Sequence, residues 1–168
     1  LSEAQAQFDK ALAIDPSAFW PNYYRAVCAY RLHDYAAALN AAYVCVALSP
    51  TSAQCFYNRG LAHQALNQSQ PALADYEQAL DLEPALGAAA CAASILLSAA
   101  GDYDKAATTL RDALKHGADP AAAYYHLALV DIGRKNRWSA LKNLAVAVKY
   151  DPAYAPALAL QAELEKER

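Results

Sequence analysis

The stretch YEQALDLEP, residues 76–84, decides the fold because the chain repeats it at a fixed interval. FDKALAIDP at residues 8–16 has the same aromatic start, Ala-Leu centre and acid-Pro end, and LAVAVKYDP at residues 144–152 follows the pattern more loosely. These copies lie 68 positions before and after the first stretch, and ALNAAYVCVALSP, which ends at Pro50, lies halfway to the earlier copy. The repeating unit is therefore 34 residues long.

Breaks in the apolar pattern recur in phase with this unit. Proline ends a helix because it lacks an N–H group and clashes with the preceding turn. The major breaks are Asp15-Pro16, Ser49-Pro50, Glu83-Pro84 and Asp151-Pro152, and weaker breaks lie between them at His33-Asp34, Asn67-Ser69, Gly101-Asp102 and Lys135-Asn136. Since no run of β-branched residues alternates as a half-buried strand would, each unit is predicted to be two helices joined by a tight turn.

The predicted helices follow directly from these breaks. The first helices of the units cover about residues 19–32, 53–66, 87–100 and 121–134, and the second helices cover about 35–48, 69–82, 103–116 and 138–150. An unpaired second helix is expected at 2–14, so we expect the chain to be a segment of a longer protein. A last helix at 155–167 carries Leu158, Leu160 and Leu164 and ends in charged residues, which is typical of a solubilising cap.

The second unit resembles the tetratricopeptide repeat, a 34-residue helix-turn-helix motif. Phe56 stands at the usual Trp position, and Tyr76 stands at the aromatic site of the second helix. The small sites and the stop are occupied by Gly60, Ala72, Ala79 and Pro84. The resemblance implies an all-α fold, a right-handed superhelical solenoid of such repeats closed by a C-terminal capping helix. We expect one array over 1–168, with a truncated repeat at 1–18, full repeats at 19–52, 53–86, 87–120 and 121–154, and the cap at 155–168.

Bulk composition narrows the classes of partner. The formal charge of −3 gives no broad basic field for phosphates, so we expect no nucleic acid as the main partner. No apolar run reaches the length of a membrane span, and we expect no membrane insertion. The four cysteines, Cys28, Cys45, Cys55 and Cys91, lie in helical pattern without a CxxC pair, so we interpret them as small buried thiols. Unpaired thiols favour a reducing compartment, and the predicted location is cytoplasmic.

We find no convincing catalytic, metal-binding or phosphate-binding motif in the sequence. Ser139 and Lys142 spell an S-x-x-K pattern, but its companion motifs K-T-G and S-D-N are missing from the sequence, so we attribute it to chance. The four histidines are scattered over separate units without an H-E-x-x-H motif, and no glycine-rich phosphate loop occurs. We therefore expect no enzyme activity, no metal and no cofactor.

The fourth unit departs from the resemblance at two places. Asp131 stands where the family usually has Tyr, and we expect it to be exposed or paired with Arg134 or Lys135. The segment 134–137, Arg-Lys-Asn-Arg, forms a basic turn that is followed by Trp138. We interpret this turn as solvated rather than as a phosphate contact.

The candidate binding site comes from the resemblance. In related arrays the first helices line the concave side, at unit positions 2, 5, 6, 9, 12 and 13. Carried over, the groove residues are Trp20, Tyr23, Tyr24, Val27, Tyr30 and Arg31 in the first full unit, Gln54, Tyr57, Asn58, Leu61 and Gln64 in the second, and Tyr125, His126 and Leu129 in the fourth. This groove is aromatic, apolar and nearly uncharged. Independently of the family, Tyr23, Val27 and Tyr30 follow the i, i+4, i+7 spacing of one helix face.

Asn58 is the best-placed polar residue of this groove. An amide side chain donates and accepts hydrogen bonds at once, which suits the N–H and C=O groups of a peptide backbone. Related arrays use Asn at this unit position for that purpose. The chaperone-binding members capture a carboxylate with several Lys and Arg residues, and here Arg31 alone qualifies.

The sequence therefore predicts a non-catalytic protein-interaction module that holds a partner's peptide or helix in an aromatic groove. Two alternatives remain open. The unpaired helix at 2–14 offers an apolar face to a second copy, which would give a homo-oligomer through the open N-terminal repeat. The phrase FWPNYYRAVCAYRL, residues 19–32, is similar to arrays appended to bacterial signalling kinases, which would make the chain a regulatory segment of a larger protein.

Overall fold

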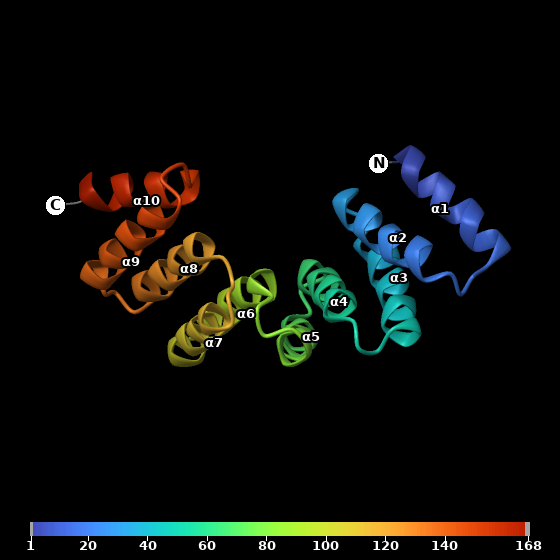
Figure 1. The fold of residues 1–168 in the computed structure, drawn as a ribbon, viewed down its shortest axis with the longest axis horizontal. Helices are drawn as coiled ribbons and strands as arrows, with labels where there is room; N and C mark the ends of the chain where they lie inside the picture. Colours follow the sequence, from blue (N-terminus) through green and yellow to red (C-terminus); the bar gives the residue numbers. More distant parts are fainter. Residues whose placement is uncertain (1, 167–168) are drawn as a thin grey trace. The chain divides into compact units, whose positions relative to one another are not determined.

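The computed structural model describes residues 2–166, and within that range the chain forms ten α-helices and no β-strand (Figure 1). In chain order they are α1 (Ser2–Ile14), α2 (Phe19–Arg31), α3 (Tyr35–Leu48), α4 (Ala53–Ala65), α5 (Ser69–Leu82), α6 (Gly87–Ala99), α7 (Tyr103–Lys115), α8 (Pro120–Gly133), α9 (Arg137–Tyr150) and α10 (Ala155–Lys166). Every helix begins and ends within one residue of its predicted bounds, although position 167 lies outside the described residues. The predicted all-α helical repeat fold is confirmed.

The helices group into two compact units, an N-terminal unit of Leu1–Glu83 and a C-terminal unit of Pro84–Arg168. In the N-terminal unit each of α1 to α4 packs against the next helix in the chain, and α2 also contacts α4. In the C-terminal unit α6 to α10 follow the same scheme, with α6 against α8. The first helices of successive repeats therefore lie next to one another inside each unit.

The turn inside each repeat has the same backbone conformation. His33, Asn67, Gly101 and Lys135 all have positive φ, between 59° and 82°, and they lie 34 positions apart. In each turn the next residue donates its N–H group to a carbonyl five residues earlier, as in Asp34 to Ala29 and Asn136 to Asp131, at 2.9 and 2.8 Å. This is the Schellman end of a helix, in which the left-handed residue lets the chain reverse. Three of these turns cap the following helix with Asp34, Asp102 or Asn136.

These turns give the first testable prediction. Lys135→Gly should stabilise the fold by about 0.5–1 kcal/mol, because Gly adopts positive φ without the penalty that a Cβ atom imposes. Gly101→Ala is the matched opposite change. A Cβ atom there meets nothing within 4 Å, so its expected loss of about 1–2 kcal/mol comes from the φ of +82° alone. Urea melts of both variants test the pair, and shifts of the same sign in both would contradict it.

The core is built from alanines that alternate with one large residue per repeat. Tyr76, Leu110 and Leu144 recur at one repeat position and are fully buried, while Ala42 takes that position in the first full repeat. Small residues beside them let the helix backbones approach. A Cβ atom on Gly60 would lie 2.6 Å from the Tyr76 ring, so only glycine fits there. The repeat pattern is thus a packing pattern between two helices.

The last helix covers the end of this core. Ala157 is fully buried, and Leu160 and Leu164 pack against a cluster that includes Leu144. Leu158 of the same helix is exposed. The role of α10 as a cap stays a prediction, and the charged residues 167 and 168 lie outside the described part of the chain.

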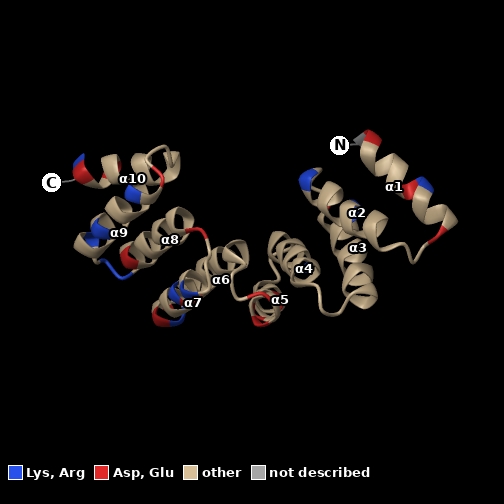
Figure 2. Cartoon of the chain, viewed as in Figure 1, with Lys and Arg blue, Asp and Glu red and all other residues tan. Residues whose placement is uncertain are grey.

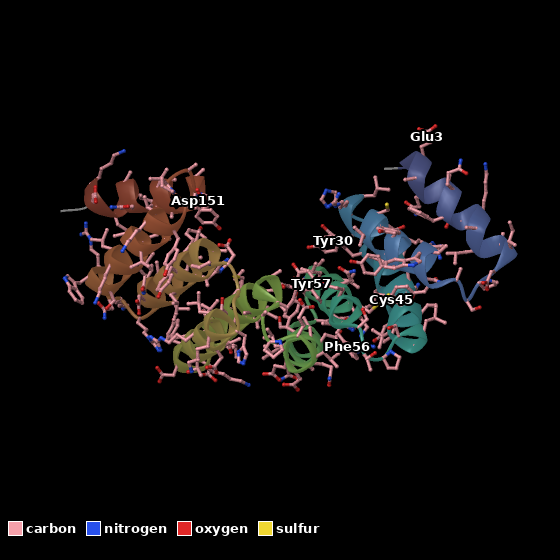
Figure 3. The ribbon with its side chains drawn as sticks, in the orientation of Figure 1. Glu3, Tyr30, Cys45, Phe56, Tyr57 and Asp151 are labelled. Carbon is pink, nitrogen blue, oxygen red and sulfur yellow. A yellow bond between two sulfur atoms is a disulfide. The ribbon has the colours of Figure 1, made fainter. Side chains whose placement is uncertain are left out.

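The structure corrects the prediction that all four cysteines are unpaired thiols. Cys45 of α3 and Cys55 of α4 are joined by a disulfide, with their Cα atoms 5.7 Å apart and both residues buried (Figure 3 labels Cys45). The prediction of unpaired thiols is wrong for these two residues and right for Cys28, which is buried and free. Cys91 is also free, and burial, followed by the charge of Asp119, raises the pKa of its thiol to about 12. The expectation of a reducing compartment loses the support of the paired cysteines.

No helix within residues 2–166 is both long and apolar enough to cross a bilayer.

Candidate functional site

The face shared by α2 and α4 contains a pocket of about 320 Å³ in the N-terminal unit. Figure 3 labels Tyr30 on α2 and Tyr57 on α4, which both line it. The complete lining is Tyr23, Ala26, Val27, Tyr30, Arg31, Tyr57, Asn58 and Leu61. All of these except Ala26 belong to the predicted groove, so half of the fourteen predicted site residues come together in one hollow.

Helix geometry explains why these side chains converge. Tyr23, Val27 and Tyr30 lie on one face of α2 by their i, i+4, i+7 spacing. Ala29 and Ala62 are fully buried in one cluster, and their small side chains let α2 and α4 approach closely. The residues flanking that contact are turned outward and stay half-buried, which leaves a hollow walled by tyrosines.

Asn58 brings an unsatisfied donor into this pocket. Its Nδ2 atom is shielded from solvent and has no hydrogen-bond partner among the described residues. A buried donor without a partner costs about 1–3 kcal/mol relative to a paired one. The wall of the pocket thus holds one amide nitrogen whose N–H groups are not used by the fold.

The charge of the pocket comes from one residue. Arg31, in the last turn of α2, is exposed and carries a positive charge at one end of the lining. Burial, followed by the neighbouring Tyr35, raises the pKa of Tyr30, so its hydroxyl remains a hydrogen-bond donor at neutral pH. The remaining lining is neutral, in agreement with the predicted lack of charge.

Four other predicted residues of the N-terminal unit lie outside the pocket lining. Trp20 and Tyr24 belong to an aromatic cluster, with ring centroids 5.9 Å apart, and Tyr24 also stacks on Phe8 of α1 at 5.8 Å. Both remain well exposed, at 62% and 45%. Gln64 accepts a hydrogen bond from the Tyr76 hydroxyl at 2.6 Å, and Gln54 donates to Glu83 at 3.4 Å. The two glutamines therefore serve contacts within the fold.

The three predicted residues of α8, Tyr125, His126 and Leu129, are half-buried in the C-terminal unit. The Tyr125 ring contacts the rings of His126 and Tyr154, with centroids 5.4 and 5.8 Å away. Burial lowers the pKa of His126, which favours its neutral form. These residues thus form a local cluster around α8, and their part in a binding surface stays a prediction.

One polar network could not be found by sequence reasoning. Arg59 of α4 donates to both carboxylate oxygens of Asp75 of α5, at 2.6–3.1 Å, and Asp75 is buried. His63 joins it, with Nδ1 2.6 Å from Gln68 and Nε2 3.3 Å from the Tyr43 hydroxyl. The Arg59 guanidinium also lies 4.9 Å from the centre of the Tyr43 ring. The sequence does not show this network of His63. A helical period indicates which residues share one face of a helix, but it does not show which residues of α3, α4 and α5 meet.

The structure agrees only in part with the prediction for Asp131. It is buried rather than exposed, but it is paired as predicted, with its Oδ1 atom 3.5 Å from Arg134. Asn143 donates a further hydrogen bond to its Oδ2 atom at 2.8 Å. Within residues 2–166, no three His, Cys, Asp or Glu residues are grouped so that they could hold a metal ion.

One repeat of the chain matches a known protein family. Residues 53–86 match the family model described as tetratricopeptide repeat. Curated protein sequences give no match to the chain. The family match covers the second full repeat, the one whose sequence follows the motif most closely.

Several solved structures are similar to the whole chain. The crystal structure of MamA is 20% identical, with a TM-score of 0.77 over 90% of this chain and 88% of that one. TTC0263, a thermophilic TPR protein of Thermus thermophilus, is 20% identical, with a TM-score of 0.80 over 95% and 88%. YrrB, described as a TPR protein with an unusual peptide-binding site, is 24% identical, with a TM-score of 0.74 over 96% and 83%. Residues 53–86 therefore match the tetratricopeptide repeat in sequence, and the chain shares its fold with solved structures of tetratricopeptide-repeat proteins.

Proposed function

We propose that the pocket between α2 and α4 binds a peptide segment of a partner protein. Tetratricopeptide repeats are in general non-catalytic modules for protein–protein interaction. The observation that carries the proposal is the Nδ2 atom of Asn58, which is shielded from solvent and has no hydrogen-bond partner in the wall of a tyrosine-lined hollow. A fold leaves such a donor unpaired at a cost, and a ligand that accepts from it removes that cost.

The lining suggests the chemistry of the ligand. Tyr23, Tyr30 and Tyr57 combine a large apolar surface with a polar tip, the combination that anchors partners at interfaces. The hollow of about 320 Å³ has room for one bulky apolar side chain beside Asn58. A backbone carbonyl of the ligand would accept from Asn58, and an acidic residue of the ligand would be favoured near Arg31. The peptide-binding site described for YrrB is a property of that protein and gives this proposal an analogy in fold.

The test uses peptides selected from a random twelve-residue library displayed on phage. Selected peptides should share a bulky apolar residue, and Asn58→Ala should weaken their binding by about 1–3 kcal/mol, measured by calorimetry, because a ligand carbonyl would then be buried unpaired. The same change should leave the free energy of unfolding unchanged or raise it, because it removes a buried donor that has no hydrogen-bond partner.

Asn40→Ala is the matched control, because Asn40 is an exposed amide on α3 outside the pocket lining. It should leave the affinity of the selected peptides unchanged. Equal affinities for the Asn58→Ala variant and the unmodified chain would refute the proposed groove.

A further inference from the structure

A second pocket of about 330 Å³ lies in the C-terminal unit, where α7, α8 and α9 meet. Its lining is mostly polar and carries three cations and one carboxylate: Arg111, Asp131, Arg134, Asn136, Trp138, Ser139, Lys142 and Asn143. The turn between α8 and α9 and the adjoining part of α9 carry the positive charges seen in Figure 2. This concentration is unusual in a chain whose formal net charge is −3.

The one acidic residue of the lining, Asp131, already has hydrogen-bond and ion-pair partners. Asp131 is held by Arg134 and by Asn143, and Arg134 also forms an ion pair with Asp104 of α7. Arg111 and Lys142 have no carboxylate partner among the described residues. Lys142 instead lies over the Trp138 ring, 5.5 Å from its centre. Two cations of the lining are therefore left without an anion.

The corresponding repeat positions in the N-terminal unit show which side chains the helix packing itself requires. Residues 68 positions earlier are Tyr43 for Arg111, Leu66 for Arg134, Gln70 for Trp138 and Ala74 for Lys142. At that earlier place Tyr43 contacts His63 and Arg59, and Arg59 neutralises Asp75. The same helix packing is thus achieved without an unpaired cation. Packing does not explain Arg111 and Lys142.

We propose that the pocket of α7, α8 and α9 binds an oxyanion, the phosphate or carboxylate of a side chain on a protein partner. Arg111 and Lys142 would supply charge-assisted hydrogen bonds from two sides, and Trp138, which is 72% exposed, would cover the apolar part of that side chain. A volume of about 330 Å³ suits one side chain rather than a polynucleotide strand, which needs a longer basic track. The site is separate from the Asn58 pocket and does not rest on the function proposed there.

The fluorescence of Trp138 can report binding at this pocket. The chain has two tryptophans, so in a Trp20→Phe background the fluorescence reports on Trp138 alone. The probes are three pentapeptides, acetyl-Ala-Ala-X-Ala-Ala-amide, in which X is phosphoserine, glutamate or serine. Saturable quenching is expected with phosphoserine or glutamate, and whichever binds more tightly identifies the oxyanion. Arg111→Gln and Lys142→Gln should each weaken that binding by about tenfold, because each removes one charge-assisted contact.

Lys149→Gln is the matched control, since Lys149 is an exposed cation on the same helix outside the pocket. It should change the affinity less than twofold, and Asn58→Ala should not change it. The proposal is overturned if the serine peptide quenches equally, if neither acidic peptide binds, or if Lys149→Gln weakens binding as much as Arg111→Gln. It is also overturned if a ten-nucleotide single-stranded RNA binds more tightly than both acidic peptides through Arg111 and Lys142.

Discussion

Tyr76→Ala is expected to lower the free energy of unfolding by about 3–5 kcal/mol, because truncation of a fully buried aromatic residue leaves a cavity between α4 and α5. The Tyr76 ring has no exposed surface and lies against Gly60. Its hydroxyl donates to Gln64 at 2.6 Å, so this hydrogen bond is lost as well. Urea denaturation followed by circular dichroism measures the change.

A double-mutant cycle with Gly60→Ala distinguishes cavity formation from a general loss of stability. Alone, Gly60→Ala should cost about 1–3 kcal/mol, since its Cβ atom would clash with the Tyr76 ring. In the Tyr76→Ala background the clash with the ring is gone and a close contact of 3.2 Å with the Ala72 carbonyl oxygen remains, so the same change should cost much less or be stabilising by up to about 1 kcal/mol. Strict additivity of the two changes would show that Gly60 and Tyr76 do not form one packing unit.

Loss of the Cys45–Cys55 disulfide is expected to cost about 2–4 kcal/mol, because this bond closes a loop across ten positions and so restricts the unfolded chain. It joins the second helix of one repeat to the first helix of the next. The test compares urea melts with and without a phosphine reductant. The unmodified chain should be less stable when reduced, whereas the Cys45→Ala/Cys55→Ala variant should give one midpoint in both conditions.

Cys28→Ala is the control for this experiment, since Cys28 is buried and free. It should keep the response to the reductant. If alkylation of the denatured, unreduced chain labels all four cysteines, the disulfide is not formed in solution and the predicted stabilisation fails.

Helix positions could be predicted from the sequence because their causes are local. Pro16, Pro50, Pro84 and Pro152 remove backbone donors at fixed intervals, and each affects its own turn whatever the rest of the chain does. The 34-residue period then places every helix to within one residue. The candidate groove was partly predictable for the same reason, since one helix face is set by spacing alone, and Tyr23, Val27 and Tyr30 do line one pocket.

Contacts between helices were decided by the tertiary structure. The spacing of Cys45 and Cys55 in sequence did not show that their side chains would meet, because that depends on how α3 turns against α4. The pairing of Arg59 with Asp75, the burial of Asp131 and the unpaired cations Arg111 and Lys142 have the same origin. Each depends on side chains from different helices that reach one point, and a periodic pattern gives the direction of a side chain on its own helix but not the distance to its neighbour. The repeat was therefore determined by the sequence alone, and the pockets, the disulfide and the charge pairs by how the repeats pack.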